Sequence, residues 1–151
     1  ISQEFILGLR FSQWKQHDFE AKLARTTDDL KKVLLSPVES GLDYLHSSMR
    51  RFWESEFEGS EENLAYWTKK ISNIPTIGVG SVGLDSDFID MTAPSKPASI
   101  DKAIDDISKE KYDLLAVGRA LLSDHEWVLK MKDGRLKDVI PYSKEALLKL
   151  Y

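Results

Sequence analysis

The strongest constraint on the fold is the regular recurrence of four short apolar segments. They are FILGLRF at 5–11, LDYLH at 42–46, TIGVG at 76–80 and YDLLAV at 112–117. Their starts recur at about 35 residues, the length of one strand with its loop and a returning helix. Continuous apolar character is typical of parallel strands that are covered on both faces. The pattern therefore predicts four buried parallel strands.

Helix start signals lie between these segments. Thr27, Ser60 and Ser99 each precede acids or apolar residues at helical spacing, so each is a candidate cap. Gly41 is expected to stop the first helix, and Pro37 is expected to break that helix into two pieces.

Two further helices are expected after the fourth strand. One runs from Glu126 to Lys132, and Ser143 caps the other. Strands that alternate with helices predict an α/β fold with a parallel sheet, either doubly wound or a barrel.

The composition narrows the class of protein. The chain has 151 residues, 42% of them apolar, and a net charge of -4, as expected for one globular domain without a basic field for nucleic acid or an anionic membrane. It has no cysteine and no apolar run near the ~20 residues of a membrane helix, so we expect a cytoplasmic protein. The first residue is Ile1, and we expect a piece of a longer protein.

A glycine motif follows the third strand. Residues 78–83 read GVGSVG, which matches the G-x-G-x-x-G fingerprint of dinucleotide-binding folds. That fold also needs an acid at the end of the next strand to hold a ribose. The next strand ends instead in Gly118 and Arg119, and a basic residue there suits a phosphate.

The ends of the third and fourth strands together suggest a phosphate site. In a barrel, the loops after strands 7 and 8 bind phosphate through exposed backbone N–H groups. Gly80 and Gly118 would let a phosphate approach the backbone, and Arg119 offers a guanidinium fork. The alternative is that both glycines only make tight turns and that Arg119 forms a surface ion pair.

Arg10 lies in an apolar strand, where an unpaired charge would be costly. It either stabilises negative charge on a reduced flavin ring or pairs with an internal carboxylate.

The three histidines, at 17, 46 and 125, lack metal-ligand spacing, so we expect no metal site. The basic-aromatic run 50–53 lies beside several glutamates, which favours a helix or loop face over a nucleic-acid contact.

The sequence resembles the second half of NADH:flavin oxidoreductases of the Old Yellow Enzyme family. The resemblance covers essentially the whole chain and is carried by GLRFS at 8–12, GLDYLHSSMRRFWE at 41–54, PTIGVGSVGL at 75–84, YDLLAVGRALLSDHEWVLK at 112–130 and PYSKEALLKLY at 141–151. It implies the C-terminal half of a TIM (β/α)8 barrel, strands 5 to 8, spanning residues 1–151 with no second domain. The segment 91–98, with Pro94 and Pro97, departs from the shorter loops common in the family.

The resemblance also implies a cofactor site. Arg10 would face the flavin N1 and C2 oxygen of FMN, while Gly80, Ser81, Gly118 and Arg119 would hold its phosphate. The parent protein would pass hydride from NADH or NADPH through FMN to an activated alkene or similar acceptor. The family's proton-donating and substrate-orienting residues would precede Ile1, so no catalytic residue is assigned in this chain.

Two other functions stay open. One is a phosphate-binding barrel of different chemistry, such as a sugar-phosphate isomerase, and the other is a non-catalytic, self-associating half barrel. A half barrel would leave its interior face, which we place at Leu7, Leu45, Ile77 and Leu115 or their neighbours, in need of a partner. That partner would be the missing N-terminal half or a second copy of the chain.

Overall fold

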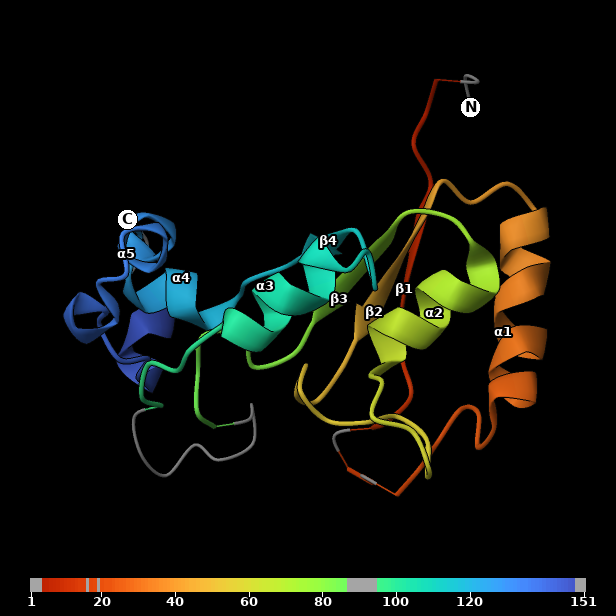
Figure 1. Ribbon diagram of the computed structural model, residues 1–151, viewed down its shortest axis with the longest axis horizontal. Helices are drawn as coiled ribbons and strands as arrows, with labels where there is room; N and C mark the ends of the chain where they lie inside the picture. The colour runs from red at the N-terminus through yellow and green to blue at the C-terminus, as the bar shows by residue number, and fades with distance from the viewer. Residues whose placement is uncertain (1–3, 16, 19, 87–94, 149–151) are drawn as a thin grey trace.

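The computed structural model describes residues 4–15, 17–18, 20–86 and 95–148; Ile1 and much of the segment 91–98 lie outside the described residues. Strands and helices alternate through the third helix, and short helices follow the fourth strand (Figure 1). The elements are β1 (Gly8–Ser12), α1 (Thr27–Glu39), β2 (Tyr44–Ser48), α2 (Leu64–Ser72), β3 (Thr76–Val79), α3 (Asp101–Ser108), β4 (Leu114–Leu115), α4 (Arg119–Ser123), α5 (Trp127–Lys132) and the 3-10 turns η1 (Leu136–Asp138) and η2 (Lys144–Leu148).

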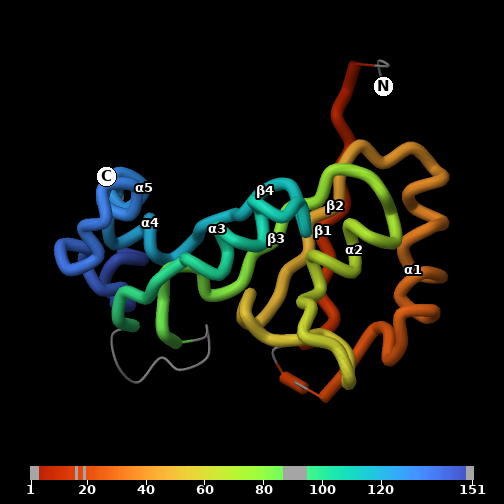
Figure 2. The backbone as a smooth tube through the Cα atoms, viewed as in Figure 1, coloured from red at the N-terminus to blue at the C-terminus, as the bar shows by residue number. Residues whose placement is uncertain are grey.

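The four strands form one parallel sheet in the order β1-β2-β3-β4. Figure 2 traces the chain that connects them. The predicted α/β class and parallel pairing are therefore confirmed. β1, β3 and β4 are shorter than the apolar segments suggested, and β4 has only two residues. β2 has the expected five residues but begins two positions later, at Tyr44.

Two of the strands are each preceded by an aspartate that hydrogen-bonds to the neighbouring strand. Asp43 donates its N–H to the Leu7 carbonyl at 2.8 Å and accepts the Leu7 N–H on Oδ2 at 2.7 Å. Asp113 makes the same pair of bonds with Thr76, at 3.0 Å and 2.7 Å. β1 is thus tied to β2, and β3 to β4, by one repeated device at the amino ends of the strands.

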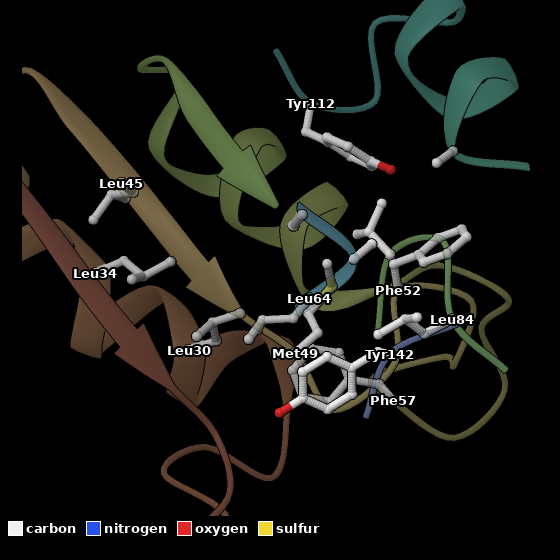
Figure 3. Packing of buried hydrophobic residues seen from close by; sticks show 14 of the residues in the cluster. Leu30, Leu34, Leu45, Met49, Phe52, Phe57, Leu64, Leu84, Tyr112 and Tyr142 are labelled. Carbon is white, nitrogen blue, oxygen red and sulfur yellow. The ribbon is translucent and has the colours of Figure 1, made fainter. Parts of the chain in front are cut away.

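One face of the sheet packs on helices. Ser47 is fully buried and its Oγ donates to Thr68 Oγ1 of α2 at 2.9 Å. A Cβ added at Gly78 would lie 3.1 Å from the Ala65 Cβ, so α2 approaches the bare backbone of β3 closely. Leu45 is also fully buried on this face, beside Leu30 and Leu34 of α1 (Figure 3).

Among the described residues, the opposite face of the sheet is partly exposed to solvent, and we call it the open face. Its central row is Arg10, His46, Ile77 and Leu114, which are partners in register across the four strands. Leu114 is 60% exposed and Arg10 is exposed as well.

The prediction for the interior face was wrong in part. Leu45 and Leu115 alternate with His46 and Leu114 along their strands, so they lie on the helix-covered face with the buried core. The expected set mixed the two faces because a continuous apolar run carries no alternation from which the face can be assigned.

The helix starts differ from the sequence expectation at two caps. Thr26, not Thr27, caps α1, since its side chain accepts from the Asp29 N–H at 3.1 Å. Asn63, not Ser60, caps α2 by accepting from the Tyr66 N–H at 2.9 Å. Ser60 instead closes its own small turn by accepting from the Glu62 N–H at 3.0 Å. Ser99 does lie at the start of α3, where its Oγ accepts from the Asp101 N–H at 3.0 Å.

The prediction that Pro37 breaks α1 was wrong. The helix runs on to Glu39, so only two residues follow the proline. A proline this close to the end removes one backbone donor where few turns remain to be disrupted. Gly41 does follow the helix with a φ of +97°, as expected for a stop residue.

A buried ion pair organises the C-terminal part. Asp124 is 1% exposed and accepts from Lys130 Nζ at 2.8 and 3.0 Å. The same carboxylate accepts from the backbone N–H groups of Glu126 at 3.1 Å and Ile140 at 2.9 Å. Burial opposes the charge, but the bonds from Lys130, Ile140 and Glu126 outweigh it and lower the pKa of Asp124. One carboxylate thereby joins α4, α5 and the segment after η1.

Candidate functional site

The structure brings the ends of β3 and β4 together. Gly80 and Ser81 follow β3, and Gly118 and Arg119 follow β4. Arg119 Nη2 donates to Ser81 Oγ at 3.3 Å and to the Ser86 carbonyl at 3.2 Å. The two strand ends that the sequence singled out are therefore in direct contact through Arg119.

The packing of a neighbouring loop explains the glycine at position 80. A Cβ there would lie 2.8 Å from the Met49 carbonyl oxygen and would force the backbone to shift. The loop after β2 hydrogen-bonds to the end of β3. The Met49 N–H donates to the Val79 carbonyl at 2.7 Å, and the Phe52 N–H donates to the Gly80 carbonyl at 3.0 Å. Gly80 is thus required by the fold itself.

Ser81 adopts an unusual conformation for a residue with a side chain. Its φ is +46°, in the left-handed region that favours glycine. The Oγ donates to the Arg50 carbonyl at 3.2 Å while it accepts from Arg119. Strain of this kind persists only where the surroundings hold it, and it is concentrated at functional sites.

Gly118 differs from Gly80 in its surroundings. A Cβ added at Gly118 would meet no atom within 4 Å. Close packing therefore does not account for the missing side chain, and open space lies beside the backbone next to Arg119.

Arg119 is held by an aromatic ring that sequence reasoning missed. The guanidinium carbon lies 5.5 Å from the centroid of the Tyr142 ring, within range of a cation–π contact. Tyr142 is nearly buried, and its backbone pairs with Ser95 through bonds of 3.0 and 2.8 Å. No local pattern in the sequence indicates this contact, because it depends on how the C-terminal segment folds back.

Arg10 lies elsewhere on the sheet. It is on the edge strand β1, and its Nη2 donates to Ser48 Oγ on β2 at 3.1 Å. No carboxylate pairs with it among the residues that the structure describes. Its charge lies on the open face, at the β1 edge of the sheet. The contact between Ser81 and Arg119 lies toward the other edge, where β3 and β4 end.

The other candidates take structural positions. Phe52 is buried, and Arg51 Nη1 donates to Glu54 Oε1 at 2.9 Å, so the basic-aromatic run is part of a packed loop. No grouping of three or more metal-ligating side chains occurs in the described part of the chain. None of the helices described there has both the length and the apolar character to cross a bilayer.

Comparisons with known proteins agree with this architecture. The sequence is 29% identical to an NADH oxidase from Thermoanaerobacter brockii, in an alignment covering 92% of this chain and 20% of that protein. The fold is similar to that of morphinone reductase in complex with tetrahydroNAD, with a TM-score of 0.56, 14% identity and coverage of 85% of this chain and 29% of that one. It is also similar to the old yellow enzyme from Trypanosoma cruzi, with a TM-score of 0.55, 15% identity and coverage of 84% and 28%. No family model matches the sequence.

These likenesses confirm the resemblance to oxidoreductases of the Old Yellow Enzyme kind. The fold is that of a part of those barrel enzymes, and the sequence similarity is to an NADH oxidase. The chain spans between a fifth and a third of the length of these relatives.

Proposed function

We propose that this chain is the C-terminal half, strands 5 to 8, of a (β/α)8 barrel that binds FMN and NADH or NADPH. In this proposal, residues 1–151 all belong to that half. The observation that carries the proposal is the contact between the ends of β3 and β4, where Arg119 meets Ser81 beside the open space at Gly118. The likeness to an NADH oxidase and to old yellow enzymes supports flavin and nicotinamide cofactors.

The residues at this edge fit a phosphate group. Arg119 carries a fixed charge and five N–H donors, and the contacts with Ser81, Ser86 and Tyr142 restrict its side chain before any ligand arrives. The Ser81 hydroxyl and the backbone beside Gly118 add polar groups without bulk, whereas Met49 fills the space beside Gly80. This chain would therefore hold the FMN phosphate, and an arginine positioned in advance loses less freedom on binding.

Arg10 has a different role in this proposal. Bound FMN would supply hydride-transfer chemistry between a reduced nicotinamide and an activated alkene or similar acceptor. Arg10 would stabilise the negative charge of the reduced ring, because it brings a fixed charge to the open face and no carboxylate neutralises it among the described residues.

The open face of the sheet needs a partner for this function. Ile77, Val79 and Leu114 lie on that face without a covering layer among the described elements. The missing first half of the barrel, or a second copy of this chain, would cover it. Substrate-orienting and proton-donating residues are assigned to that missing half.

The test is FMN titration of the full-length apoprotein at fixed salt. Arg119→Ala should weaken binding by about 1.5 to 3 kcal/mol, the cost of losing a hydrogen bond to a charged group. Arg135→Ala is the matched control, since Arg135 is also exposed to solvent in part but pairs with Asp133 at 3.2 Å. Equal FMN affinity for the Arg119 variant and the parent would refute the phosphate assignment.

A further inference from the structure

His46 is a polar residue at the centre of the open face. It is the register partner of Arg10 on one side and Ile77 on the other. Neighbouring positions on the same face, Val79 and Leu114, are apolar. An apolar side chain would suit a barrel interior better than an imidazole, so the presence of His46 at this position needs a physical explanation.

The ring of His46 has an unused hydrogen-bonding atom. Its Nε2 has no hydrogen-bond partner among the described residues, and surrounding atoms cover it, so a ligand that bonds to this nitrogen must displace them. Burial and the nearby Arg10 charge both lower the pKa of His46, so the imidazole is neutral near pH 7. A neutral imidazole supplies one N–H donor and one acceptor, and it adds no second positive charge beside Arg10.

The surroundings define what such a group would contact. Arg10, His46 and Ser48 form a polar group on β1 and β2, with Arg10 bonded to Ser48. Tyr44 is the other titratable residue on this face of β2, and the facing positions of β3 are apolar. A planar ligand with an apolar body and one polar edge of carbonyl and N–H groups matches this division.

We propose that His46 contacts the flavin ring next to Arg10 and hydrogen-bonds to its polar edge. The inference rests on the proposed FMN function. His46 would act as a binding residue of the ring, distinct from the phosphate contacts at Arg119. Its N–H would also favour the reduced ring, since a donor near developing negative charge stabilises it.

The experiment uses full-length protein and two substitutions. His46→Leu removes both hydrogen-bonding nitrogens, and it should weaken FMN binding about tenfold, as expected for one lost hydrogen bond. It should also make the flavin reduction potential more negative. His46→Gln restores a donor and an acceptor, so it should recover most of both quantities. His17→Leu, at an exposed histidine, is the matched control.

A measurement on the unsubstituted protein guards against a variant that fails to fold. The imidazole 15N resonances of His46, assigned through the His46→Gln spectrum, should move when FMN is added to the apoprotein. If FMN binds and neither these resonances nor the potential of the His46→Leu variant changes, the inference is wrong while the proposed function stands. If the unsubstituted protein binds no FMN, the proposed function itself fails.

Discussion

The ion pair between Asp124 and Lys130 allows a quantitative prediction about stability. Asp124 is 1% exposed and Lys130 is 8% exposed, so both charges are removed from water. Asp124→Ala would leave the ammonium of Lys130 with only the half-exposed Glu126 carboxylate, 3.8 Å away, and would leave the Ile140 N–H without its acceptor. Breaking a buried pair from one side costs about 3 to 5 kcal/mol, because the remaining charge loses its close partner.

A double-mutant cycle in the full-length protein tests the cause. Asp124→Ala should lower the free energy of unfolding by that amount, and Lys130→Met combined with it should recover much of the loss because no charge is then stranded. Amide hydrogen exchange at Ile140 should accelerate in the single variant. Glu126→Gln is the control, since the Glu126 carboxylate is 3.8 Å from Lys130 and half exposed. A double variant as unstable as Asp124→Ala would refute the reasoning.

The same pair gives a direction for pH dependence. The pKa of Asp124 is lower in the folded protein than in the unfolded chain, so its charge contributes stability that is complete above the unfolded pKa of about 3.9. That contribution should disappear as the pH falls through the folded pKa. The free energy of unfolding, measured by denaturant titration, should therefore decrease in the parent as the pH is lowered from 6 into the acid range. The variant that combines Asp124→Ala with Lys130→Met should lack this decrease.

Three further predictions concern the site and the isolated chain. Tyr142→Leu should weaken FMN binding by about 0.5 to 2 kcal/mol by removing the ring beside Arg119, while Tyr142→Phe keeps the ring and should bind like the parent; equal loss in both would exclude the cation–π contact. Arg10→Met should make the flavin potential more negative with moderate binding retained, and a potentiometric titration without that shift would return Arg10 to a structural role. The 151 residues alone should self-associate and show no NAD(P)H-driven turnover, which light scattering and an enone-reduction assay would check; a stable monomer would contradict the half-barrel assignment.

The parallel pairing of the strands could be predicted because it depends on local signals. Apolar runs at regular intervals imply parallel strands, and the carboxyl ends of parallel strands lie at one edge of the sheet. The segments at Gly80 and Arg119 were therefore expected at the same edge, and the contact of Arg119 with Ser81 agrees with this expectation. The reason for Gly80 could not be predicted, since the Met49 carbonyl that excludes a Cβ belongs to a different loop.

Contacts between distant segments could not be predicted. Asn63 caps α2 in place of Ser60, and its Nδ2 also donates to the Phe52 carbonyl at 2.8 Å, a contact that no local pattern indicates. Tyr142 reaches Arg119 only because the chain after η1 folds back and pairs with Ser95. The sheet face on which Leu45 lies could not be predicted for a related reason. A strand that is covered on both faces is apolar on both faces, and only the strand register shows which residues share a face.

The paired bonds of Asp43 and Asp113 have a consequence for how the chain folds. Leu7 and Asp43 are 36 positions apart, and Thr76 and Asp113 are 37 positions apart. Neither junction can close as a local hairpin, because a segment that contains a whole helix separates each aspartate from its backbone partner. Pairings this distant slow folding, since loop entropy is lost before the contacts form. On the ribosome, the junction of Leu7 with Asp43 would therefore stay open until β2 emerges.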